Sequence, residues 1–238
     1  MFLYGINILM EAIKSGQKIK RVYILEGIKR FEEIKSILEK NRIHFQKVPE
    51  KILRKLSEGE KNQGVVFEID DFKYYSLEDF LKIDKKNWFL ILLDQIQDPH
   101  NLGAIIRTAV CAGADGIVIT KDRSAKVTPA VVKVSAGLIF NIPIIMVTNL
   151  VNTIKTLKEK GIWVYGADMK GKNLWQTDFK IPLALVMGNE GSGLRKLVKE
   201  SCDELVSIPM KNDADSLNVS VSTGILAFEV MRQREYSG

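Results

Sequence analysis

Apolar side chains follow alternating helical and strand periods along the first 70 residues. In residues 6–16 they recur every three or four positions, the spacing of a helix with one buried face, and residues 22–27 form a short apolar run that ends at Gly27. The alternation continues, with Pro49 and Gly59 marking the two ends of one helix. It predicts further helices at 31–42 and 49–59 and strands at 44–48 and 63–69. We therefore expect residues 1–70 to form a small α/β domain.

Residues 71–86 show neither period, and we expect a linker with one helical turn there. In residues 87–238, apolar runs without polar alternation, typical of strands covered on both faces, alternate with helical segments. The pattern predicts strands at 88–93, 116–120, 142–147, 162–168, 181–188 and 203–210, and helices at 104–113, 129–137, 153–161, 193–201 and 221–234. These elements make a mostly parallel sheet sandwiched by helices. Ligands of such sheets bind beyond the carboxyl ends of strands, which here are the segments that follow Leu93, Gly188 and Pro209.

Composition narrows the class of protein. The 238 residues are 46% hydrophobic and 27% charged, which excludes an intrinsically disordered chain. No apolar run reaches the roughly 18 residues of a membrane span, so we expect a cytoplasmic protein that does not enter membranes. Cys111 and Cys202 lie far apart, and only two histidines are present, so neither a disulfide framework nor a metal site is expected.

The net charge of +6 favours an anionic partner. Residues 1–70 contribute 14 basic and 10 acidic side chains, so this part of the chain is the more basic one. Any single lysine there is adequately explained as a solvated surface residue. Only the regional excess indicates a polyphosphate partner.

The segment that follows Leu93 combines a polar turn with the start of a helix. Asp98, Pro99 and Asn101 fit ordinary turn and helix-capping chemistry. Arg107 fits it less well, because the helical residues around it are Ala, Ile, Thr and Val, and a charge in apolar surroundings needs an acceptor. That acceptor is either a ligand or the partner in a structural salt bridge.

Residues 185–194 place three glycines between a predicted strand and a predicted helix. Glycines allow backbone amides to approach a ligand closely, and the start of a helix adds N–H donors. The order GxxGxG followed by Leu-Arg matches neither a dinucleotide-binding fingerprint nor a P-loop. Because Glu190 would repel a phosphate, a neutral or cationic nucleotide-like ligand fits this loop better than ATP.

Residues 208–224 repeat the order of strand end, polar loop and helix. Ser216 is the expected N-cap of that helix, and Asn218, Ser220 and Ser222 fit its first turns. Each of these residues alone is explained equally well by capping. The three polar segments together are not, because all of them follow strands of the same predicted sheet.

Three stretches resemble known motifs in order and spacing: DPHNLGAIIRTA at 98–109, MGNEGSGL at 187–194, and SIPM with SLNVSVSTGILAFE within 207–229. They resemble the signature motifs of the SpoU/TrmH-like RNA ribose 2′-O-methyltransferases of the SPOUT superfamily. The resemblance covers residues 87–238. KDRSA at 121–125, VTNL at 147–150 and the YGIN start are similar to the branch that methylates a guanosine of 23S rRNA.

The resemblance implies a C-terminal trefoil knot, a small N-terminal RNA-binding domain similar to a ribosomal-protein fold, and a homodimer. It also implies that S-adenosyl-L-methionine lies between the loops at Gly188, Ile208 and Leu217, held largely by backbone groups. Further cofactor contacts are expected from Met187, Asn189 and Gly191. The matched catalytic positions are Asn101, Arg107, Glu190, Ser216 and Asn218, with no metal.

We expect Arg107 to stabilise the ribose alkoxide electrostatically, because an arginine is a poor base at neutral pH. The expected partner is 23S rRNA or a large-subunit assembly intermediate. Three alternatives remain open: a tRNA ribose methyltransferase, a catalytically silent RNA-binding ribosome-assembly factor, and a nucleotide-dependent enzyme of doubly wound architecture.

Overall fold

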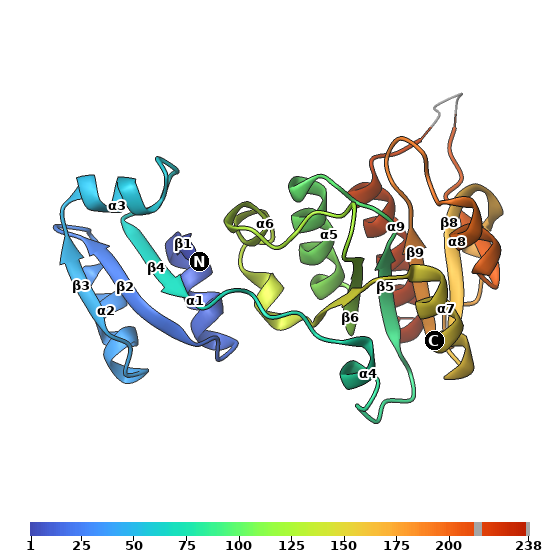
Figure 1. The fold of residues 1–238 in the computed structure, drawn as a ribbon, viewed down its shortest axis with the longest axis horizontal. Coiled ribbons are helices and arrows are strands. Elements are labelled where there is room, and N and C mark those ends of the chain that lie inside the picture. The colour runs from blue at the N-terminus through green and yellow to red at the C-terminus, as the bar shows by residue number, and fades with distance from the viewer. Residues whose placement is uncertain (212–215, 237–238) are drawn as a thin grey trace. The chain divides into compact units, whose positions relative to one another are not determined.

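The structure, a computed structural model, describes residues 1–211 and 216–236 (Figure 1). These residues form two compact units. The first contains residues 1–73 and 127–141. The second contains residues 74–126, 142–211 and 216–236. The segment 127–141 thus belongs to the first unit, although it lies within the second along the chain.

The first unit is built on a four-stranded sheet with the order β1-β4-β2-β3. Strand β4 pairs antiparallel with β1 and β2, and β2 pairs parallel with β3. The predicted helices and strands are confirmed, but β1 was not predicted, because three residues are too few to show a period. The elements are β1 (Phe2–Tyr4), α1 (Ile6–Lys14), β2 (Ile19–Leu25), α2 (Phe31–Lys40), β3 (Phe45–Val48), α3 (Glu50–Leu56) and β4 (Val65–Ile69).

The segment 127–141 of the first unit carries α6 (Pro129–Val134) and the 3-10 turn η1 (Leu138–Asn141). Lys133 Nζ lies 2.5 Å from Glu60 Oε2, and Asn141 Nδ2 donates to Glu11 Oε1 at 2.5 Å. At Gly137 an added Cβ would lie 3.3 Å from the Cα of Ile8. Polar and steric contacts therefore join α6 and η1 to the N-terminal residues.

The second unit is built on a six-stranded sheet with the order β10-β8-β9-β5-β6-β7, in which every pair is parallel. This confirms the predicted parallel sheet. Figure 1 shows its strands between helices. The strands are β5 (Phe89–Leu93), β6 (Gly116–Thr120), β7 (Ile144–Val147), β8 (Trp163–Asn173), β9 (Leu183–Met187) and β10 (Glu204–Ser207). The helices are α4 (Leu77–Phe80), α5 (Pro99–Cys111), α7 (Leu150–Glu159), η2 (Leu174–Gln176), α8 (Lys196–Ser201) and α9 (Val219–Glu235).

Side chains that alternate along the strands bury both faces of this sheet. On one face, Leu90 and Leu92 of β5 pack with residues of α4, α7 and α8 in a single apolar cluster. On the other face α5 packs against α9, and the guanidinium of Arg234 lies 5.6 Å from the centre of the Phe89 ring. The one-turn helix α4 confirms the helical turn that was expected within residues 71–86.

Strand β8 runs past its predicted end at residue 168, and its pairing with β10 shifts abruptly. Leu205 pairs with Gly166, whereas the next residue, Val206, pairs with Lys172, so residues 167–171 leave the ladder. A Cβ at Gly171 would lie 2.5 Å from Val206 N, a separation that only glycine permits. The shift leaves residues 167–171 of β8 without partners in β10.

Buried polar groups fix the C-terminal half of α9. The amide of Gln233 accepts from Phe179 N at 2.8 Å and donates to Thr177 O at 3.0 Å. The side chain of Glu229, 7% exposed, accepts two hydrogen bonds of 2.8 Å from Arg232. Because each buried donor and acceptor named here is satisfied, this end of α9 is held by specific partners.

Candidate active site

A pocket of about 480 Å³ opens at the carboxyl ends of β8, β9 and β10. Four parts of the described chain line it: residues 167–170, which leave the β8–β10 ladder, residues 187–193 after β9, Lys199 of α8, and residues from the end of β10 into α9. Two of these segments were selected from the sequence. The pocket therefore lies where the parallel-sheet rule places a ligand site.

The glycine loop after β9 is shaped by a close backbone approach. A Cβ at Gly188 would lie 2.3 Å from the carbonyl carbon of Gly193, so this position requires glycine. Asn189 and Gly193 exchange two backbone hydrogen bonds of 3.0 and 2.8 Å, which close the loop on itself. The side-chain oxygen of Asn189 also accepts from Gly191 N at 3.0 Å. The backbone of this loop thus forms one wall of the pocket.

Side chains from all three sequence segments meet beside this loop. Asp98 caps α5 by accepting from His100 N at 2.8 Å, as ordinary capping predicts. One turn later, Asn101 donates to Asp98 and to Glu190, and its own oxygen accepts from Asn218 Nδ2 at 3.1 Å. The buried amide of Asn101 therefore joins the three segments in one hydrogen-bonded cluster.

Most of the predicted cofactor and catalytic residues line the pocket, and three do not. The lining contains every position predicted for the cofactor, together with Glu190 and Ser216. Asn101 and Asn218 are joined to it through Glu190, whereas Arg107 is not among the lining residues. The predicted residues in the lining are Met187, Gly188, Asn189, Glu190, Gly191, Ile208, Ser216 and Leu217.

The sequence predicted apolar surroundings for Arg107, and this prediction is wrong. Its side chain is exposed in the single chain, and within residues 1–211 and 216–236 it forms no ion pair, so it is not a structural salt bridge either. Arg107 lies six residues after Asn101, about 9 Å along the axis of α5 and on another side of the helix. The apolar residues beside Arg107 in the sequence lie on the faces of α5 that pack inward. The sequence pattern alone did not distinguish those faces from the face that carries Arg107.

The predicted N-cap at Ser216 is also wrong. Helix α9 begins at Val219, and its N-cap is Asn218, whose side chain accepts from Ser220 N at 2.8 Å. The same Asn218 amide donates to Asn101, so capping and the polar cluster use different atoms of one residue. Ser216 is exposed and lines the pocket two residues before the cap.

The sequence analysis missed three charged lining residues, Asp168, Lys170 and Lys199. Asp168 accepts from Lys199 Nζ at 2.6 Å, which places an ion pair in the pocket wall. Burial acts to raise the pKa of Asp168, but hydrogen bonds from Lys199 and the Lys170 backbone outweigh it, and the pKa lies below its ordinary value. Asp168 is the last residue of the predicted strand 162–168, so the rule of carboxyl ends would have found it.

The chemistry of the lining suits an organic ligand with apolar and polar parts. Met187, Ile208 and Leu226 offer apolar surface, and the glycine loop and Asp168 offer hydrogen-bonding groups. Among the described residues no cluster of three His, Cys, Asp or Glu side chains could hold a metal ion. The helices within that same part of the chain include none that is both long and apolar enough to cross a membrane.

Comparison with known proteins gives consistent matches over the whole chain. Residues 88–228 match the model of the SpoU rRNA methylase family, and residues 2–75 match the model described as RNA 2′-O ribose methyltransferase substrate binding. The chain is 40% identical to a putative TrmH family tRNA/rRNA methyltransferase of Bacillus subtilis, over 100% of this chain and 97% of the relative. It is also 40% identical to the 23S rRNA (guanosine-2′-O-)-methyltransferase RlmB of Haemophilus influenzae, over 98% and 97%.

Among solved structures, the chain is similar to an AdoMet-bound rRNA methyltransferase from Sinorhizobium meliloti. The two share a TM-score of 0.82 and 30% identity over 99% of this chain and 88% of that one. The family match extends over the two sequence segments that line the pocket and over the third, which is hydrogen-bonded to them. By its sequence and its fold, the chain belongs to the SpoU rRNA methylase family.

Proposed function

We propose that this protein transfers a methyl group from S-adenosyl-L-methionine to a ribose 2′-hydroxyl of RNA, and that its substrate is a guanosine of 23S rRNA. One observation carries the proposal: two of the motif segments line a single pocket, and the third is hydrogen-bonded to them beside it, where Asn101 contacts Glu190 and Asn218. Family membership gives the reaction class, and relatives named as 23S rRNA guanosine methyltransferases support the substrate.

The residues present fit S-adenosyl-L-methionine. A volume of about 480 Å³ lies within the usual range for pockets that hold organic ligands of this size. Apolar contacts from Met187, Ile208 and Leu226 suit a purine ring, and the backbone of residues 188–193 supplies hydrogen-bonding groups to polar atoms of the ligand. When bound, the cofactor supplies a methyl group on a positively charged sulfur. The pocket's part in the reaction is to hold this group in line with the ribose oxygen.

We assign to Arg107 the stabilisation of negative charge on the ribose oxygen. A guanidinium is always protonated near neutral pH, which suits charge stabilisation and not proton abstraction. The hydrogen-bonded cluster has a complementary role, because Glu190 and Asn218 fix the amide of Asn101 and thereby the polar rim of the pocket. Ser216, exposed in the lining, is free to contact the RNA.

The position of Arg107 leads us to propose a homodimer. In the single chain this side chain is exposed and absent from the pocket lining, so the pocket lacks the guanidinium that we assign to the ribose oxygen. Helix α9, which packs on the helix that carries Arg107, exposes Val221 and Phe228 at 50% and 43%. A second copy covering this apolar surface would bring Arg107 of one subunit toward the pocket of the other.

We also propose the finer architecture that the family resemblance implied. Residues 1–70 act as an RNA-binding domain of ribosomal-protein type, residues 71–86 as the linker, and residues 87–238 as a catalytic domain whose C-terminal part is tied in a trefoil knot. The substrate-binding family match over residues 2–75 and the basic character of residues 1–70 support the first assignment. The enzyme would act in the cytoplasm on 23S rRNA or a large-subunit assembly intermediate.

A methyl-transfer assay tests the proposal. Purified protein is incubated with methyl-tritiated S-adenosyl-L-methionine and, in parallel, with 23S rRNA, with large-subunit precursors and with tRNA from a strain that lacks the corresponding gene. We expect labelling of 23S rRNA or its precursor at one guanosine, located by resistance of the ribose to alkaline cleavage. Labelling of tRNA alone would contradict the substrate assignment. RNA binding without any transfer would contradict the enzyme assignment and favour a silent assembly factor.

A further inference from the structure

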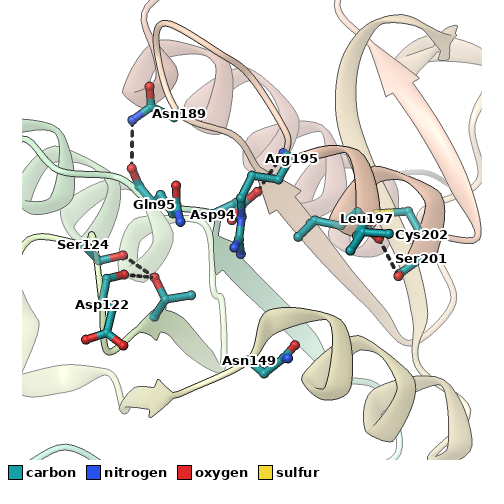
Figure 2. A network of polar contacts seen from close by, with 12 residues as sticks. Asp94, Gln95, Asp122, Ser124, Asn149, Asn189, Arg195, Leu197, Ser201 and Cys202 are labelled. Carbon is teal, nitrogen blue, oxygen red and sulfur yellow. Dashed lines mark hydrogen bonds and ion pairs between the residues drawn. The ribbon is translucent and has the colours of Figure 1, made fainter.

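Asp94, the residue directly after β5, contacts both ends of the glycine loop. Its backbone N–H donates to Met187 O at 2.9 Å, at the start of the loop. Its two carboxylate oxygens accept from Arg195 at the other end, from the backbone N at 2.9 Å and from Nε at 2.7 Å. Figure 2 shows Asp94 and Arg195 joined in this way. One residue thus spans the loop that forms the pocket wall.

The next residue adds a third attachment. The carbonyl oxygen of Gln95 accepts from the side-chain amide of Asn189 at 2.8 Å, the contact drawn at the upper left of Figure 2. Gln95 has a φ of +61°, the left-handed region that non-glycine residues seldom adopt. A backbone held in this region needs support from its surroundings. Here the hydrogen bond from Asn189 to the Gln95 carbonyl provides such support, and it comes from the glycine loop. Asn189 in turn closes the loop through Gly191 and Gly193.

The carboxylate of Asp94 has no exposed surface, whereas its partner Arg195 is 45% exposed. A buried carboxylate is stable only if it is paired and hydrogen-bonded. Both partners named above for its oxygens come from Arg195, so the loop end is specified by the requirement to satisfy this one charge. Neither Asp94 nor Arg195 lines the pocket, so any effect on a ligand must pass through the loop.

We propose that Asp94 is a positioning residue, which with Arg195 holds residues 188–194 in the conformation that binds S-adenosyl-L-methionine. The inference rests on the proposed function, because it concerns the affinity of the same pocket. It assigns to the Asp94–Arg195 pair a role in cofactor binding without contact to the cofactor.

Calorimetric titration with S-adenosyl-L-methionine, without RNA, tests the proposal on the full chain. Asp94→Asn removes the charge but keeps the shape, and Arg195→Met removes the guanidinium while keeping the backbone N–H that donates to Asp94; urea unfolding checks that both variants are folded. Loss of a charge-assisted hydrogen bond corresponds to about a tenfold or larger rise in Kd. The double variant is expected to bind about as weakly as Asp94→Asn alone, because both changes break the same contact.

Asp203 provides a matched control. Its carboxylate accepts from a backbone N–H, that of Val164 at 2.9 Å, and pairs with Lys158 Nζ at 2.8 Å. It lies just before the amino end of β10, whereas the pocket is at the carboxyl ends of the strands, and it does not line the pocket. Asp203→Asn is therefore expected to leave the Kd for S-adenosyl-L-methionine within about twofold of the wild type. This holds even if Asp203→Asn lowers the free energy of unfolding as much as Asp94→Asn does.

Amide hydrogen exchange of the ligand-free protein gives a second readout. The N–H groups of Gly191 and Gly193 are both hydrogen-bonded to Asn189, and we expect both to exchange faster in Asp94→Asn but not in Asp203→Asn. Unchanged exchange and unchanged Kd in folded Asp94→Asn, or equal weakening in both variants, would overturn the positioning role. A wild-type protein that fails to bind S-adenosyl-L-methionine would refute the proposed function, while the exchange rates still decide the role of Asp94.

Discussion

Replacement of Gly188 by alanine examines the backbone contact that shapes the pocket. The added methyl group would lie 2.3 Å from Gly193 C, 2.4 Å from Leu194 N and 2.6 Å from Gly193 O. All three atoms belong to the backbone, so no side-chain rotation can make room. Residues 188 and 193 must separate, and the two hydrogen bonds between Asn189 and Gly193 are then lost or lengthened.

The cost follows from these two effects. Overpacking against rigid neighbours typically destabilises by about 1–3 kcal/mol, and each lost backbone hydrogen bond adds about 1 kcal/mol. Partial relaxation of the loop lowers their sum, so we expect Gly188→Ala to reduce the free energy of unfolding by about 2–4 kcal/mol. Because the loop lines the pocket, affinity for S-adenosyl-L-methionine should fall by more than about tenfold.

Gly191→Ala is the control for stability within the same loop. Its added Cβ would meet only Asn189 Oδ1 at 3.7 Å, an ordinary contact, and its φ lies outside the left-handed region. Urea unfolding followed by circular dichroism gives the free energies, and calorimetry gives the affinity. If Gly188→Ala unfolds within about 0.5 kcal/mol of the wild type and binds equally well, the loop is not fixed by this close approach.

Three further predictions concern single side chains. Arg107→Ala should lower turnover by about 100- to 1,000-fold with an unchanged cofactor Kd, and Arg107→Lys should retain more; a pH–rate profile that follows the new amine would instead indicate a base. The Arg232 hydrogen bonds, opposed by burial, hold the pKa of Glu229 below its ordinary 4.5, so its stabilisation is present above pH 4.5 and is lost as the pH falls through the lowered pKa. Between pH 6 and 3 the wild type should thus lose more unfolding free energy than Glu229→Gln, and parallel curves would contradict this. Burial raises the pKa of Cys202 to about 12, so iodoacetamide at pH 8.5 should alkylate it far more slowly in folded than in urea-unfolded protein, as mass spectrometry of the peptide will show.

The sequence predicted what depends on local periodicity. Buried strands such as β5 and β9 are continuous apolar runs, so their positions and the parallel sheet followed directly. The loop residues that end these strands then located the pocket, because the carboxyl ends of parallel strands share one edge. Gly188 was selected by this argument, and the close approach to Gly193 supplies its physical reason.

What the sequence did not predict depends on pairs far apart in the chain. Asp94 and Arg195 are separated by 101 positions, and nothing near either one indicates the other. The exposure of Arg107 depends on which face of α5 packs inward, which periodicity in a nearly all-apolar helix does not settle. Ser216 and Asn218 are both suitable N-cap residues by type, so the sequence alone did not show that α9 begins at Val219, with Asn218 as its cap.

The placement of α6 limits how this protein can be divided. The chain passes between the two compact units three times, after residues 73, 126 and 141. A catalytic fragment that starts at residue 74 would keep α6 and η1 but lose their partners Glu11 and Glu60. Transplanting the N-terminal region onto another enzyme would require the 127–141 insertion to travel with it, so RNA-recognition chimaeras should exchange both pieces together.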